Sequence, residues 1–269
     1  MILILFISLS KPYRSTELVS INENGIDIII IIDVSASMQA TDFTPNRLEA
    51  TKTIVKDFIR RSSGNRIAMI VFAKHTFTLS PATTDHLVLY ELINGLSLET
   101  IDHYTSGGTA IGDSILKGTE LAKSIKIEDR DQALILLTDG DNNAGINNNL
   151  ATKYAVDHQL KIYTIGLGST SEITVNPDID DPEWNFTTKL IEEPLIKIAS
   201  TSNGKYFHAS NNAALNEIFV EIAKLEQTPL EINKFKQKKY YRYNLNLSIG
   251  TLFILALIIK SIFIRRPLK

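Results

Sequence analysis

The sequence contains no cysteine in its 269 residues, so it has no disulfide framework, no thiolate zinc site and no cysteine nucleophile. It also lacks an excess of charge of either sign, because its net charge is −2 and its isoelectric point is about 6.2. No global basic field therefore favours nucleic acid as a partner. A chain of this length folds as one large domain or two small ones, with ample material for a packed core.

Several catalytic signatures are missing as well. The sequence has no G-x-x-x-x-G-K-[ST] loop for nucleotide phosphates and no G-x-S-x-G turn for a serine nucleophile. The motif Gly166-Leu167-Gly168 lacks the third glycine of a dinucleotide fingerprint and is interpreted as a turn. The five histidines are scattered along the chain without an i,i+4 pair. We therefore predict that the protein is not an enzyme.

The chain does contain an alternation of strand-like and helix-like segments. Residues 26–32 form a continuous, mostly β-branched run, which is typical of a central parallel strand buried on both faces. Residues 75–79 alternate in polarity and follow another apolar run closely, which predicts an antiparallel edge strand after a tight turn. The other expected strands are Arg66–Phe72, Ala133–Leu137, Lys161–Ile165 and Lys205–His208.

Helical patterns fill the gaps between these strands. Thr44 and Pro45 are interpreted as the N-cap and first residue of a helix that continues to Arg60. The segment Thr109–Ile125 carries apolar residues at spacings of three and four, which indicates a buried helical face. Further helices are expected at Asp85–Leu96, Asn148–His158, Leu190–Ser202 and Ala213–Leu225, and a loop or hairpin at residues 170–188. The prediction is an α/β, doubly wound fold with a mostly parallel sheet and one antiparallel edge strand.

Apolar residues are concentrated near the C-terminus. Residues 247–264 are almost wholly apolar, and at ~1.5 Å rise per residue they are just long enough to cross a bilayer core of ~30 Å. Lys260 lies about one turn from the far end, so its ammonium can reach towards Arg265 and Arg266. We predict a C-terminal transmembrane helix, and the alternative is a buried core helix.

The apolar run at residues 1–10 is too short to span a bilayer. It is interpreted as the remainder of a longer membrane helix, and the alternative is a short interfacial segment. The predicted organisation is a truncated membrane segment and linker at 1–25, the α/β domain at 26–228, a basic juxtamembrane linker at 229–245, the transmembrane helix at 246–264 and a tail at 265–269.

Three polar segments follow the ends of predicted strands. Asp33, Ser35 and Ser37 come directly after the first strand, Asp139 follows the strand at 133–137, and Thr109 opens a helix after Gly107 and Gly108. In a doubly wound fold these positions meet at the carboxyl ends of the strands. They supply two carboxylates and three hydroxyls, with no imidazole or thiol. Such an all-oxygen set suits Mg²⁺ or Mn²⁺ and neither zinc nor copper.

The D-x-S-x-S, then T, then D pattern at Asp33, Ser35, Ser37, Thr109 and Asp139 resembles the metal-ion-dependent adhesion site (MIDAS) of von Willebrand factor A (VWA) domains. The resemblance covers about residues 26–226 and extends to Asn46–Lys52, Thr109–Asp113, Tyr163–Gly168 and Leu195–Phe207. These segments look like the BatA/BatB branch of bacterial VWA proteins, which is named for aerotolerance operons. Ala36 departs from that branch, which usually has glycine there.

The resemblance implies a binding function. Ser35, Ser37 and Thr109 would contact the ion directly, Asp33 and Asp139 would act largely through water, and a partner protein would supply an Asp or Glu ligand. The partners implied are other VWA and repeat proteins of a Bat-type operon and a MoxR-type AAA+ ATPase, together with membrane lipid. The branch also implies a domain on the outer side of the bacterial inner membrane, where a cytoplasmic ATPase could not reach the ion.

Both the membrane side of the domain and its function have alternatives. A basic and aromatic run at residues 234–243 lies directly before the predicted membrane helix, and its positive charges would favour a cytoplasmic domain. The family arrangement outweighs this signal in our interpretation. The alternative functions are a metal-dependent hydrolase or phosphatase that uses the same ion, and adhesion to an extracellular ligand.

Overall fold

The computed structural model describes the backbone of residues 14–19, 25–62, 64–97, 108–127, 130–175, 185–225, 236–241 and 245–264. The chain divides into two compact units. The larger unit spans Glu23–Leu230, and the smaller one combines Met1–Asn22 with Glu231–Lys269.

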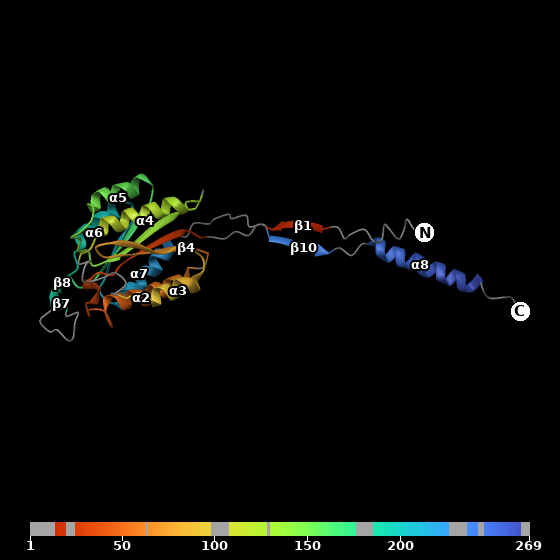
Figure 1. Ribbon diagram of the computed structural model, residues 1–269, viewed down its shortest axis with the longest axis horizontal. Coiled ribbons are helices and arrows are strands. Elements are labelled where there is room, and N and C mark those ends of the chain that lie inside the picture. The colour runs from red at the N-terminus through yellow and green to blue at the C-terminus, as the bar shows by residue number, and fades with distance from the viewer. Residues whose placement is uncertain are drawn as a thin grey trace. The chain divides into compact units, whose positions relative to one another are not determined.

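A six-stranded sheet in the order β4-β3-β2-β5-β6-β9 forms the centre of the larger unit (Figure 1). Every neighbouring pair is parallel except β3 and β4, which pair antiparallel at one edge. The predicted mostly parallel sheet with one antiparallel edge strand is therefore confirmed. The strands are β2 (Asp27–Asp33), β3 (Arg66–Phe72), β4 (Thr76–Thr83), β5 (Gln132–Thr138), β6 (Lys161–Leu167) and β9 (Tyr206–Ala209).

Helices cover both faces of this sheet, as Figure 1 shows. One face carries α2 (Arg47–Arg61), α3 (His86–Asn94) and α7 (Asn212–Leu225). The other carries α4 (Ile111–Ile125), α5 (Asn148–Asp157) and α6 (Glu192–Thr201). A short 3₁₀ helix, η1 (Ala36–Gln39), follows β2, and β7 (Ile173–Val175) pairs antiparallel with β8 (Phe186–Thr188). The predicted hairpin within residues 170–188 is confirmed by this pair.

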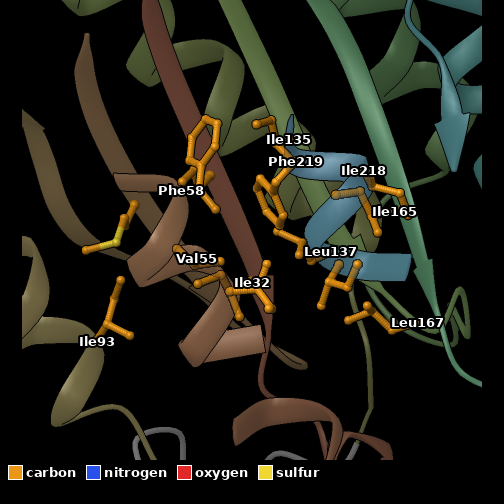
Figure 2. Packing of buried hydrophobic residues seen from close by; sticks show 14 of the residues in the cluster. Ile32, Val55, Phe58, Ile93, Ile135, Leu137, Ile165, Leu167, Ile218 and Phe219 are labelled. Carbon is orange, nitrogen blue, oxygen red and sulfur yellow. The ribbon is translucent and has the colours of Figure 1, made fainter. Parts of the chain in front are cut away.

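The central strand β2 contributes side chains to two hydrophobic clusters, one on each face of the sheet. Ile30 and Ile32 point into the cluster that includes α2 and α7, whereas Ile29 and Ile31 point into the one that includes α4. All four side chains are fully buried, because successive residues of a strand face opposite sides of a sheet that is covered on both. Figure 2 shows the first cluster, where side chains of α2 and α7 pack against Ile32 and its neighbours on β5 and β6.

The predicted start of the first helix is wrong by two residues. The helix begins at Arg47, and its N-cap is Asn46, whose Oδ1 accepts a hydrogen bond from the Glu49 N–H at 2.8 Å. An asparagine side chain satisfies an unpaired amide of the first turn directly, and this local bond decides where the helix begins.

The smaller unit contains secondary structure that the sequence did not predict. Strand β1 (Arg14–Val19) pairs antiparallel with β10 (Lys236–Tyr241), so that Arg14 is opposite Tyr241. Both segments were interpreted as linkers. The pairing brings together two parts of the chain that lie on either side of the larger unit in the sequence.

Helix α8 spans Leu245–Ile264 in this unit, over the range predicted to be a helix. Its described apolar side chains are largely exposed, among them Leu252, Leu255 and Ile258 at 67%, 58% and 53%. Within the residues that the structure describes, no helix is both long enough and apolar enough to cross a membrane. The predicted N-terminal membrane segment at 1–10 and the tail at 265–269 lie outside the described residues.

Candidate metal centre

The predicted site lies where the strand order reverses. From β2 the chain proceeds to β3 on one side, whereas from β5 it proceeds to β6 on the other, so the carboxyl ends of β2 and β5 flank a topological switch point. Asp33 is the last residue of β2, and Asp139 directly follows β5. Both aspartates are fully buried at this point.

The turn after β2 is organised by Asp33. Its Oδ1 accepts the Ser35 N–H at 2.8 Å, and its Oδ2 accepts the Thr138 hydroxyl at 2.6 Å. Ser35 is extended and is followed by η1, which brings the Ser35 and Ser37 hydroxyl oxygens to 3.0 Å from each other. The D-x-S-x-S motif therefore gathers its two hydroxyls beside one buried carboxylate.

Asp139 is held by hydroxyl, guanidinium and backbone donors. The Ser37 hydroxyl lowers the pKa of its carboxyl group, which links this residue to the first motif. Its Oδ2 accepts Arg47 Nη1 at 3.0 Å and the Thr188 hydroxyl at 3.1 Å. Burial raises the pKa of Asp139, and the Ser37 and Arg47 interactions oppose that rise.

Thr109 is bonded through its backbone to the loop that follows Asp139. Its N–H donates to Asn143 Oδ1 at 2.9 Å, and its carbonyl accepts the Asn143 N–H at 3.1 Å. Gly108 has a φ of +132°, and a Cβ there would lie 2.9 Å from Asn143 Oδ1, so a glycine is needed for this approach. Gly107 lies outside the described residues.

The two buried aspartates repel each other, and Arg47 supplies a buried positive charge beside Asp139. The pKa of Asp33 is raised to about 7, first by burial and then by the nearby Asp139 carboxylate, against hydrogen bonds from Ser35 and Thr138. Two carboxylates buried side by side are costly without a counter-charge.

The chemistry of the donor set fits a hard cation. The hydroxyls of Ser35, Ser37 and Thr109 are neutral oxygen donors, and the two aspartates can accept from bound water. Among the described residues, no cluster of three or more His, Asp or Glu could hold a metal ion. A metal at the switch point would therefore depend on the serine and threonine hydroxyls.

Sequence reasoning missed Arg47, Asp42, Thr138 and Thr188, which surround the two aspartates. Arg47 is the most informative of these, because its side chain is completely buried and bridges Asp42 and Asp139. A signal was present in the sequence. Arg47 lies one helical turn before Thr51 and two before Val55, on the buried face of α2, where an arginine needs a carboxylate partner.

Asp113 and Asp141 support the loop after β5 through hydrogen bonds. Asp113 Oδ1 accepts the Ile146 N–H at 2.8 Å. Asp141 Oδ2 accepts the Asn143 side-chain amide at 3.1 Å, within the loop that holds Thr109. Both aspartates therefore order the loop after β5.

A doubly wound α/β domain with a D-x-S-x-S turn at its switch point is the arrangement that the sequence resemblance implies, and comparison with known families agrees with that resemblance. The model of the von Willebrand factor type A domain matches residues 27–221, and the chain belongs to this family.

Two solved structures and one sequence relative indicate the branch of the VWA family to which the chain is similar. BatB from Bacteroides thetaiotaomicron is 30% identical, with a TM-score of 0.66 over 76% of this chain and 100% of that one. An aerotolerance-related membrane protein from Bacteroides fragilis is 26% identical, with a TM-score of 0.65 over 75% and 100% of the two chains. An uncharacterized protein of Borreliella burgdorferi is 25% identical over 252 residues, which are 91% of this chain and 71% of that protein. The chain is thus a Bat-like VWA protein.

Proposed function

We propose that the domain binds one Mg²⁺ or Mn²⁺ ion at Asp33, Ser35, Ser37, Thr109 and Asp139, and grips a carboxylate of a partner protein through that ion. The observation that carries this proposal is the pair of buried aspartates at the switch point beside a hydroxyl cluster. A divalent cation would offset the mutual repulsion of the two carboxylates and meet the oxygen ligands that Mg²⁺ prefers.

The hydrogen bonds of Asp33 and Asp139 support the proposal that these two aspartates bind the ion through water molecules. Both oxygens of Asp33 already accept donors within the chain, and Oδ2 of Asp139 accepts two. If the direct ligands are the neutral hydroxyls, little of the charge of the ion is cancelled at short range. The bound ion then attracts an anionic ligand, and an Asp or Glu side chain of a partner supplies one.

The function we propose is binding. Within the described residues, no histidine is hydrogen-bonded to any of the five proposed ligands. The partners we propose are acidic segments of other Bat-type VWA or repeat proteins, with a MoxR-type AAA+ ATPase as a further associate.

A calorimetric titration of the full chain in detergent with MgCl₂ and MnCl₂ tests ion binding. Thr109→Ala removes one proposed ligand and should weaken binding. Thr119→Ala is the matched control, because Thr119 is a buried threonine of α4 whose hydroxyl donates to the Ile115 carbonyl at 2.8 Å. Wild-type protein that takes up neither ion would refute the proposal, and so would equal affinity in Thr109→Ala and Thr119→Ala.

We also propose that α8 anchors the protein in the bacterial inner membrane, with the VWA domain on the extracytoplasmic side. The exposed apolar side chains of α8 and the resemblance to a Bacteroides fragilis membrane protein support this proposal. Exchange of Leu255 and Ile258 for aspartate would place two negative charges on the exposed apolar surface of α8, which should weaken its attachment to a membrane.

Alkaline carbonate extraction tests the anchor. Wild-type chain should stay with the membrane pellet, and the Leu255→Asp, Ile258→Asp variant should be released. Leu87→Asp is the control, since Leu87 is 74% exposed on α3 in the other unit and its variant should stay in the pellet. Release of the wild type would refute the proposed membrane anchor.

A further inference from the structure

We infer that Arg47 is a positioning residue of the metal centre, which fixes Asp139 through Oδ2 and leaves Oδ1 for the ion or its water. This inference rests on the proposed function. It assigns a role to a buried arginine outside the five-residue motif, and it predicts which changes away from the ligands alter ion affinity.

The Arg47 side chain is fully buried and uses three of its N–H groups on two carboxylates. Nε and Nη2 donate to the two oxygens of Asp42, each at 2.8 Å, and Nη1 donates to Asp139 Oδ2 at 3.0 Å. The planar fork of a guanidinium fixes the angle between these bonds. The position of Asp139 is therefore set relative to Asp42 by one rigid group.

The surrounding backbone holds the guanidinium in turn. The Arg47 N–H donates to the Ala40 carbonyl at 3.0 Å, and Asp42 Oδ2 also accepts the Ser169 N–H at 2.9 Å. Gly168 packs against the guanidinium so closely that a Cβ there would lie 2.5 Å from Nη2. The segments that follow β2, β5 and β6 thus all contact Arg47, through Ala40 and Asp42, through Asp139 and through Gly168.

The two carboxylate oxygens of Asp139 have different hydrogen-bond partners, which suggests what the confinement of Arg47 is for. Oδ2 accepts both Arg47 and Thr188, whereas Oδ1 accepts the Asp141 N–H at a long 3.4 Å. Apart from the Ser37 hydroxyl, Oδ1 thus accepts one long backbone hydrogen bond, whereas Oδ2 accepts two side-chain donors. Groups that orient metal ligands from the second layer contribute about 10- to 100-fold to metal affinity.

A buried Arg–Asp pair could equally serve stability alone, and the chain contains a comparison for that role. At the other end of β2, the buried Asp27 accepts Arg66 Nε at 2.8 Å and Arg130 Nε at 2.6 Å. This cluster lies at the amino end of the strand, away from the switch point. A substitution there disturbs a similar ion pair without touching the proposed metal centre.

Arg47→Lys in the full chain, in detergent, separates the two roles. Lysine keeps the positive charge but cannot bridge Asp42 and Asp139 with a planar fork. We expect Mg²⁺ and Mn²⁺ affinity, measured by calorimetry, to fall about tenfold or more. Arg66→Lys should leave the affinity within about twofold, since distant sites act independently. Wild-type affinity in Arg47→Lys would overturn the inference.

Asp42→Asn provides a second measurement if Arg47→Lys does not fold. Asp42 is less buried, with 12% of its side chain exposed. Asparagine keeps the shape of this side chain but removes its negative charge, which weakens the ion pair with Arg47. We expect a loss of ion affinity in this variant too, and unchanged affinity would overturn the inference. If the variants bind like the wild type, only the role of Arg47 fails, whereas a wild type that binds neither ion refutes the metal centre itself.

Discussion

The hydroxyl of Thr138 donates to Oδ2 of Asp33 at 2.6 Å and so ties the end of β5 to the end of β2. Both residues are fully buried. This bond and the one from the Ser35 N–H lower the pKa of Asp33, but burial and the Asp139 carboxylate raise it more, to about 7. The ion-free domain therefore has a carboxyl group at its centre that ionises in the neutral range.

We predict that the ion-free protein loses stability as pH rises towards neutral. The pKa of Asp33 is raised from 3.8 to about 7 on folding, so between these values the folded state binds more protons than the unfolded state. The contribution of Asp33 to the free energy of unfolding is intact below the unfolded pKa. It is lost as pH rises through the folded pKa.

Thermal melts in EDTA across this pH range test the prediction. Asp33→Asn should show a weaker decrease with pH than the wild type, because asparagine does not titrate. An equal pH dependence in the two proteins would contradict the assignment to Asp33.

The fold could be predicted from the sequence because its strands are buried on both faces. Continuous apolar runs such as residues 26–32 occur in water-soluble domains mainly as central parallel strands, and the polar residues that follow them mark the carboxyl edge. Thr109 was found in the same way, from its place before an amphipathic helix. The pattern of neighbouring residues along the chain was sufficient to predict these features.

The support of the site could not be predicted, because it depends on contacts between distant segments. Thr188 reaches Asp139 from 49 residues away, and Arg47 reaches it from 92 residues away. The pairing of β1 with β10 is equally remote in sequence. Hydrophobic periodicity says which face of an element is buried, but not which polar side chain completes a buried network.

We predict that Asp27→Ala destabilises the protein by up to about 3–5 kcal/mol, because it leaves the partly buried positive charges of Arg66 and Arg130 without their carboxylate partner. Urea denaturation measures this loss. Mg²⁺ affinity should not change, since Asp27 lies at the end of β2 opposite Asp33. A large change in Mg²⁺ affinity would show that the two ends of the strand are coupled.

Gly140→Ala should be strongly destabilising, and Gly95→Ala should be nearly neutral. Gly140 has a φ of +83°, and a Cβ there would lie 2.1 Å from the Ile191 carbonyl oxygen. The Ile191 N–H donates to the backbone carbonyl of Asp139 at 2.9 Å, so the clash falls beside this bond. Gly95 has a φ of −72°, and its nearest atom would be 3.6 Å away. We expect a cost of about 2 kcal/mol or more for Gly140→Ala, from backbone strain and the clash. Similar melting temperatures for the two variants would contradict this reading of the turn after β5.

Phe219→Ala should show how far the cluster under α7 stabilises the domain. Phe219 is 2% exposed, and its ring centroid lies 4.9 Å from that of Phe58 on α2 (Figure 2). Removal of a buried phenylalanine costs about 3–5 kcal/mol, as lost burial plus a cavity. Phe77→Ala is the matched control, because Phe77 is 52% exposed on the edge strand β4 and its loss should cost no more than about 0.5 kcal/mol. Urea denaturation of both variants measures the difference, and a Phe77→Ala cost as large as that of Phe219→Ala would mean that β4 is covered in solution.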